Sequence, residues 1–183
     1  MKKNTLMTLA LSLVAPLCLA GDNAVETAKL HFTNIVKRDF AQLSKTYAAE
    51  VRLMPGHEML EELNLGKDGD GQARSVDVTR EKLLAAINAF PAQERSPARI
   101  EIDRKMLEGS VFEALEAGEG DFAINPKRPL KTPDGKLHFS IKKDDVLVRI
   151  GPPKGQGRSN DHFLLQLRME KGSWKVVAEY LPS

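Results

Sequence analysis

The C-terminal segment HFLLQLRMEKGSWKVVAEY constrains the fold most, because apolar and polar residues alternate on both sides of a Lys171-Gly172 turn. Alternation with a period of two is typical of strands with one buried face, and two such runs around a glycine turn predict an antiparallel hairpin. A two-residue loop opposes four apolar pairs: Met169 with Trp174, Leu167 with Val176, Leu165 with Ala178, and Phe163 with Tyr180. A slip of one residue would turn the buried face outward, so the hydrophobic pattern selects this register.

The same period of two recurs upstream of this hairpin. It predicts strands in RIEID (99–103), KLHFSI (136–141) and DDVLVRI (144–150). The Pro- and Gly-rich stretch 118–135 predicts a long loop, and residues 105–117 fit either a helix or a strand. The second half of the chain is therefore expected to form an antiparallel sheet.

The first half has helical periodicity instead. Residues 24–38 predict a helix whose apolar stripe is made by Val25, Ala28, Phe32, Ile35 and Val36. Asp39, three residues before Gln42, predicts a reciprocal N-cap for a second helix that reaches about residue 48. Phe40, Leu43 and Tyr47 would form its inner face.

Further along, residues 51–54 predict a short strand that a Pro-Gly pair ends. Thr79 predicts the cap of a third helix, with Leu83, Leu84, Ile87 and Phe90 on one side and Pro91 at its end. Helices that precede a run of strands indicate the α+β class.

The first 20 residues, MKKNTLMTLALSLVAPLCLA, have the layout of a secretory signal peptide: two lysines, an apolar stretch and a small-residue cleavage site at Ala20. We therefore expect a periplasmic protein with a single domain at residues 21–183. Pro16 and Leu17 fit a lipid-modified Cys18 poorly, so a lipoprotein is the less favoured alternative. No other segment approaches the roughly 20 apolar residues that a membrane span needs.

Charge and composition limit the classes of partner, metal and cofactor that the chain is expected to bind. The chain has 27 Lys and Arg against 25 Asp and Glu, and two of the lysines lie in the predicted leader. A mature chain without net charge does not favour a nucleic-acid partner. The single cysteine also lies in the leader, the four histidines are scattered, and DGDGQARSVDVT lacks the Gly and Glu of a calcium loop. We expect no metal and no cofactor.

Two segments, KRDFAQLSKTYAAEVRLMPG and the C-terminal hairpin with its tryptophan after a glycine turn, resemble the nuclear transport factor 2-like superfamily. The resemblance implies a cone-like α+β fold, with a curved antiparallel sheet wrapped around N-terminal helices and a pocket in the concavity. It also implies a choice among ketosteroid-isomerase-like or dehydratase-like enzymes, hydrolases and modules that only bind. A fold alone does not decide among these functions.

Candidate site residues follow from the predicted faces. On the inner face, the ligand-binding candidates are Tyr47, Met54, Phe163, Met169, Trp174 and Tyr180. On the outer face, the candidates for contact with a protein partner or a second subunit are Arg149, Arg168 and Lys175, of which the last two are opposed in the chosen register. Trp174 and Tyr180 are the only polar groups that the last hairpin turns inward, so it offers the pocket no acid or base.

Three functions remain open at this stage. The leading prediction is an exported small-molecule-binding or accessory protein with an apolar pocket. An isomerase or dehydratase would need a buried Asp, Glu or His whose pKa is raised. A protein-interaction module, such as an inhibitor or a toxin-immunity protein, would need an exposed patch.

Overall fold

The computed structural model describes residues 15–57, 59–60, 63, 65, 73–89, 105, 107–126, 130–152 and 162–181. Three helices are α1 (Ala15–Lys37), α2 (Phe40–Thr46) and α4 (Arg80–Ala89). The strands are β1 (Tyr47–Leu53), β2 (Val76–Thr79), β3 (Val111–Leu115), β4 (Gly120–Ile124), β5 (Leu137–Ile141), β6 (Val146–Gly151), β7 (Phe163–Glu170) and β8 (Ser173–Tyr180). None of the helices in this described part combines the length and hydropathy that a bilayer crossing requires.

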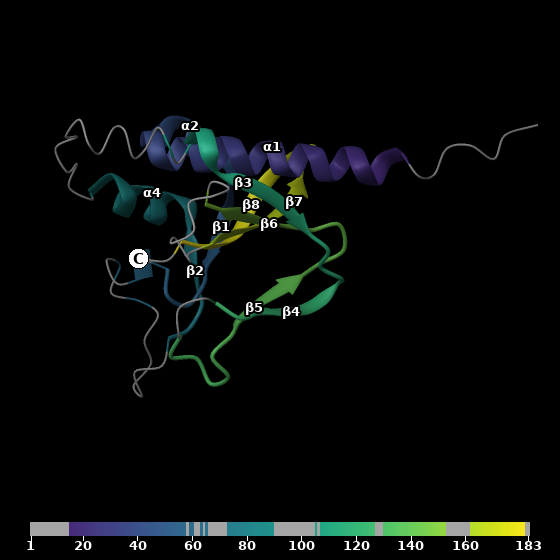
Figure 1. Cartoon of the computed structure of the whole chain (residues 1–183). Coiled ribbons are helices and arrows are strands. Elements are labelled where there is room, and N and C mark those ends of the chain that lie inside the picture. The colour runs from purple at the N-terminus through teal and green to yellow at the C-terminus, as the bar shows by residue number, and fades with distance from the viewer. Residues whose placement is uncertain are drawn as a thin grey trace, which may run out of the picture.

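The main sheet has six strands in the order β2-β1-β8-β7-β6-β3, and β4 pairs with β5 in a separate hairpin (Figure 1). Neighbouring strands are antiparallel except β1 and β8, which are parallel. The last strand of the chain therefore lies inside the sheet, between the first strand and β7.

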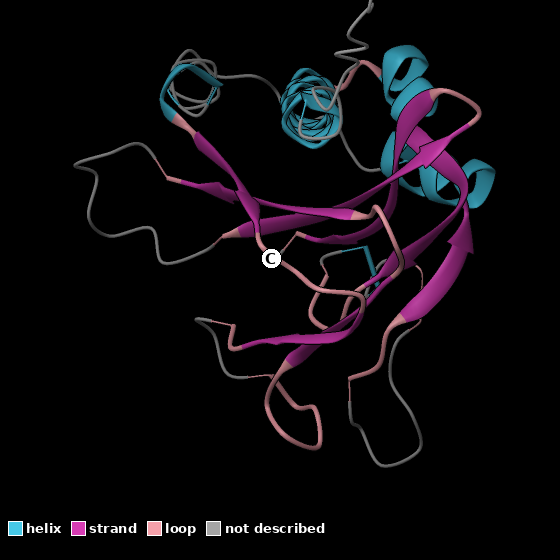
Figure 2. Cartoon of the chain, turned by 90° about the vertical axis from the view of Figure 1, so that its right-hand side faces the viewer, coloured by secondary structure: helices cyan, strands magenta, loops and turns pink. Residues whose placement is uncertain are grey.

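Two apolar clusters cover the two sides of the main sheet. Figure 2 shows the helices on one side and the β4–β5 hairpin on the other. The helix-side cluster joins α1, α2 and α4 to residues such as Val148, Leu165 and Val176. The hairpin-side cluster joins β5 to Leu147 and Tyr180, among others. Because clusters pack on both faces, the central strands bury apolar side chains on both sides, such as Leu164 and Leu165 of β7.

The predicted helices are confirmed, with changes at their ends. α1 starts at Ala15 and buries the expected stripe, with Ala28 and Phe32 in the core. Asp39 caps α2 by accepting the Gln42 N–H at 3.1 Å, but the Gln42 side chain accepts from Lys45 rather than returning the bond. α2 ends at Thr46 instead of about residue 48, because the chain turns into extended conformation at the next residue and begins to pair with β8.

Thr79 caps α4 as predicted, since its hydroxyl accepts the Lys82 N–H at 3.3 Å. The prediction missed β2, and it placed a loop where the structure has β4. β4 is a strand because Phe122 and Ile124 alternate toward the hairpin-side cluster. Residues 111–115 are a strand. The predicted strand at 99–103, Phe90 with Pro91, and the DGDG segment lie outside the described residues.

The register of the β7–β8 hairpin is confirmed near its turn and wrong beyond it. Met169 pairs with Trp174 and Leu167 with Val176, as predicted. A β-bulge at Val177 then shifts the pairing by one residue, so that Leu165 faces Glu179 and Leu164 faces Tyr180. One inserted residue reverses the faces of the remaining strand. Glu179 is consequently fully buried, although the uniform register places it on the outer face.

Candidate functional site

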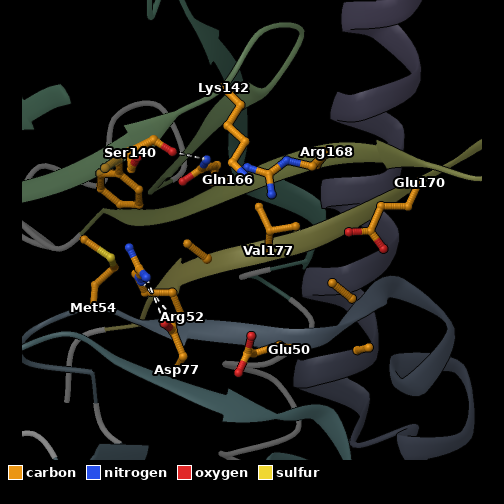
Figure 3. Close-up of a pocket in the computed structure, with 14 residues that line it drawn as sticks. Glu50, Arg52, Met54, Asp77, Ser140, Lys142, Gln166, Arg168, Glu170 and Val177 are labelled. Atoms are coloured by element: carbon orange, nitrogen blue, oxygen red, sulfur yellow. Dashed lines mark hydrogen bonds and ion pairs between the residues drawn. The ribbon is translucent and has the colours of Figure 1, made fainter. Parts of the chain in front are cut away.

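A cavity of about 460 Å³ lies on the sheet face opposite the helices. Figure 3 shows the side chains that surround it. They come from β1, β2, the β5–β6 region, β7 and the bulged part of β8: Ala48, Ala49, Glu50, Arg52, Met54, Asp77, Phe139, Ser140, Lys142, Gln166, Arg168, Glu170, Val177 and Ala178. Six of these 14 side chains carry a formal charge, so the cavity differs from the apolar pocket that the sequence predicts.

Arg168 is fixed by a buried carboxylate. Its Nε and Nη2 atoms each donate to Asp145 at 2.7 Å, a bidentate pair that holds the guanidinium in one plane. Asp145 also accepts from Gln166 Nε2 at 2.7 Å and from the Lys142 backbone N–H at 2.9 Å. These four bonds satisfy the carboxylate, and the pair raises the pKa of Arg168 above its usual range.

Arg52 is held in the same way on the other wall. Its Nε and Nη2 atoms donate to Asp77 of β2 at 2.7 and 2.8 Å (Figure 3). Hydrogen bonding to Arg52 lowers the pKa of Asp77. In each arginine, Nε and Nη2 therefore bind a carboxylate, and Nη1 lies outside that bidentate pair.

Three further ionic side chains of the cavity have no hydrogen-bond partner among the described residues: Lys142, Glu50 and Glu170. Figure 3 shows Lys142 and Arg168 converging, with Glu170 beyond Arg168 on β7 and Glu50 apart from them on β1. Gln166 is 3% exposed and donates to the carbonyl of Ser140 at 2.8 Å, whereas its side-chain oxygen accepts no bond within the described chain. The cavity therefore offers both donors and acceptors.

Glu179 of β8 is the centre of a buried polar cluster on the helix side of the sheet, directly behind the cavity. Tyr47 OH donates to both carboxylate oxygens at 3.0 Å, His57 Nε2 lies 3.0 Å from Oε1, and His31 Nε2 lies 3.4 Å from Oε2. The cluster also touches the cavity wall, since the Met54 N–H donates to the Glu179 carbonyl at 2.9 Å.

Hydrogen-bond donors decide the charge of this cluster. Burial would raise the pKa of Glu179, but hydrogen bonds from His31 and His57 outweigh it and lower the pKa to about 2. The Met59 N–H donates to His57 Nδ1 at 3.0 Å, which leaves the proton of a neutral His57 on Nε2, facing Glu179. The carboxylate is therefore ionised, and protein donors meet both of its oxygens.

His31 completes the pairing on the other side of Glu179. The Thr46 hydroxyl donates to the Leu43 carbonyl at 2.8 Å, so it accepts from His31 Nδ1 at 2.7 Å. Nε2 of the same ring faces the carboxylate at 3.4 Å, so His31 links α1 to β8 through both of its ring nitrogens.

The structure places the six ligand-binding candidates in several environments. Met54 lines the cavity. Phe163 and Trp174 belong to the helix-side core, Tyr180 belongs to the hairpin-side core, and Tyr47 binds Glu179. Met169 is 45% exposed. The bulge at Val177 separates Trp174 from Tyr180, which a uniform register places on one face.

The three interaction candidates all have partners. Arg168 and Lys175 are opposed as predicted, but Arg168 binds Asp145 and Lys175 donates to the Lys45 carbonyl, which separates the two charges. Arg149 pairs with Glu113. Of the three, Arg168 lines the cavity.

Of the candidates chosen from the sequence, only Met54 and Arg168 line the cavity, and only Tyr47 belongs to the Glu179 cluster. Glu179 contradicts the expectation that the last hairpin turns no acid inward. One signal was available: in KVVAEY, three apolar residues separate Lys175 from Glu179, which breaks strict alternation. Arg52 and Asp77 had no such signal, because their contact with the cavity depends on the pairing of β1 with β8. Among the described residues, no group of three or more His, Cys, Asp or Glu could hold a metal ion.

Solved structures of nuclear transport factor 2-like proteins are similar to the chain. A protein of unknown function from Pseudomonas putida is 14% identical over 91% of this chain and 87% of its own, with a TM-score of 0.43. Another of unknown function, from Shewanella baltica, is 10% identical over 90% and 94%, with a TM-score of 0.41.

A third, from Burkholderia xenovorans, is 14% identical over 87% and 89%, with a TM-score of 0.34. All three are nuclear transport factor 2-like proteins, the superfamily that the sequence resembles. No protein-family model matches it, and no curated protein matches it in sequence. Nothing about the site follows from similarities of this size.

Proposed function

We propose that the protein is an exported small-molecule-binding or accessory protein whose ligand occupies the cavity between β1, β5, β7 and β8. The observation that carries the proposal is the cavity of about 460 Å³, a volume within the range of small-molecule sites. Its two arginines are held rigidly by Asp77 and Asp145, so little conformational entropy would be lost when they bind a ligand.

Binding is favoured over catalysis because of the state of the buried acid. An isomerase-type reaction needs a carboxyl or imidazole whose pKa is raised toward neutrality and which reaches the substrate. Glu179 has a lowered pKa and no solvent exposure, and its oxygens already accept from Tyr47 and His57.

Native mass spectrometry of the protein from a periplasmic extract tests the proposal. We expect a co-purified small molecule, and an intact mass that starts near Gly21. Ala49→Trp should fill the cavity from an exposed lining position and abolish the complex. Ala114→Trp, at an exposed position of β3, is the matched control and should keep it.

A ligand that survives Ala49→Trp but is lost in Ala114→Trp would contradict this location. A retained leader would contradict the export part alone. If instead a substrate of an isomerase were turned over by the wild type and not by Glu179→Gln, the enzyme would be the better description.

A further inference from the structure

The order of charges along the cavity points to a class of ligand. We propose that the cavity binds a small zwitterion with an apolar tail, such as a free amino acid with an aliphatic side chain. This inference rests on the proposed function, because it concerns what the same cavity holds.

The strand registers place one acid beside each arginine of the cavity. β1 is parallel to β8 and β8 is antiparallel to β7, so β1 and β7 run in opposite directions. Tyr47 pairs with Val176 and Arg52 with Ala178, so Glu50 lies along the sheet between Arg52 and the level of Arg168. Glu170 follows Arg168 on β7 and lies beyond it (Figure 3).

The basic middle of the cavity has an unbalanced charge. Asp77 and Asp145 neutralise the two arginines through bidentate pairs. Lys142 has no anion bonded to its ammonium among the described residues, and its side chain converges with Arg168 (Figure 3). The Nη1 edge of Arg168 and the Lys142 ammonium are together the natural donors for a carboxylate.

The two unpaired carboxylates suit an ammonium group in the same ligand. Neither the Glu50 nor the Glu170 carboxylate accepts a hydrogen bond within the described part of the chain, and each interacts with its neighbouring arginine only through charge. An anion without a positive group would be repelled by these two carboxylates. A molecule with both charges satisfies Lys142 and a carboxylate together.

Apolar lining residues accept the tail. Met54 follows Arg52 on the side away from Glu50, and it lines the cavity together with Phe139 and Ala178. Met54 and Phe139 are each 1% exposed overall, so an aliphatic chain that lies against them leaves water and removes its own apolar surface from solvent.

Leucine and two analogues that each lack one charge provide the test: 4-methylpentanoate without the amine and 3-methylbutylamine without the carboxylate. Binding is measured by isothermal titration calorimetry and by amide chemical shifts of β1, β7 and β8. Each charge-assisted contact is worth about a factor of ten or more in affinity. We therefore expect leucine to bind at least about tenfold more tightly than either analogue.

Variants test which residues bind the carboxylate and which bind the ammonium group of the ligand. Lys142→Gln should weaken leucine and 4-methylpentanoate binding about tenfold, whereas Lys143→Gln, in the same turn but outside the cavity, should change neither. Glu50→Gln should weaken leucine but not 4-methylpentanoate, and Glu26→Gln on α1 is its control.

Two outcomes overturn the inference. The first is that 4-methylpentanoate binds as tightly as leucine. The second is that leucine produces neither a binding heat nor chemical-shift changes in β1, β7 and β8. The proposed function fails separately, because it requires only that some molecule co-purifies and is displaced by Ala49→Trp. A co-purified ligand of another class would leave it standing and remove the zwitterion.

Discussion

The two halves of β8 meet the helices in opposite ways. Before the bulge, Trp174 and Val176 pack into the apolar helix-side core. After it, Glu179 takes the helix-side position, and Tyr180 turns to the hairpin side. One extra residue, Val177, thus decides whether the Glu179 carboxylate lies in water or in the core.

The two halves also differ in what stabilises them. The first half gains from the removal of apolar surface from water, which tolerates changes of similar shape. The second half depends on donors from three different segments, α1, β1 and the turn that holds His57. A buried charge that loses its partners is costly, so this half should tolerate less.

The largest effect is expected from Glu179→Ala. It leaves His31, His57 and Tyr47 without their shared acceptor inside the core, which should lower the free energy of unfolding by about 4 kcal/mol. Urea denaturation measures it. Glu170→Ala, on the same hairpin but partly exposed, is the control and should cost no more than about 0.5 kcal/mol. A loss below about 1 kcal/mol for Glu179→Ala would show that the cluster is dispensable.

Trp174→Ala should cost about 3 kcal/mol, toward the low end for a buried tryptophan. The reason is that Trp174 is 7% exposed but its Nε1 has no partner among the described residues, so its removal also relieves an unpaired donor. Trp174→Phe should therefore cost less than about 1.5 kcal/mol. Native tryptophan emission should be blue-shifted and move to longer wavelength on unfolding. Equal losses for the two variants would contradict this account of Nε1.

Acid should weaken the second half selectively. The pKa of Glu179 is lowered from 4.5 to about 2 in the folded protein, so its stabilisation is complete above the unfolded pKa and is lost as the pH falls from about 4.5 toward 2. The loss should reach about 2 to 3 kcal/mol by the linkage relation. Urea midpoints at several pH values measure it, and Glu179→Gln should flatten this part of the curve. An unchanged curve in Glu179→Gln would assign the acid sensitivity to other groups.

The smallest effect is expected at the cavity wall. Arg52 and Asp77 form a bidentate pair, but both side chains are 43% exposed, so Asp77→Ala should cost about 0.5 kcal/mol. Thermal unfolding measures this change. A loss above about 2 kcal/mol would mean that the pair supports β1 and β2 rather than only orienting Arg52.

Much of the fold was predictable because its signals are local. The stripe on α1, the caps Asp39 and Thr79, and the turn at Lys171-Gly172 each depend on residues a few positions apart. The position of the bulge was not predictable from the sequence, because Val176, Val177 and Ala178 are all apolar and each suits either face of the sheet. β4 was missed because glycines and prolines surround its five residues.

The site was less predictable than the fold. Arg168 and Met54 were chosen for different reasons, on opposite expected faces, and the structure brings both to one cavity. Their meeting depends on β1 lying beside β8, a pairing across most of the chain that no local pattern reports. Glu179 was predicted on the outer face because a uniform register leaves out the bulge at Val177 that shifts the pairing.

The interior position of β8 bears on the order in which the protein can fold. β1 and β7 are separated in the sheet by β8, which follows both of them in the chain. Until β8 arrives, both have an unpaired edge that can join another chain. A shortened chain that ends before residue 173 would keep those edges exposed. We therefore expect the main sheet to form slowly, because β8 must pair with β1, which is distant in sequence, before the sheet is continuous.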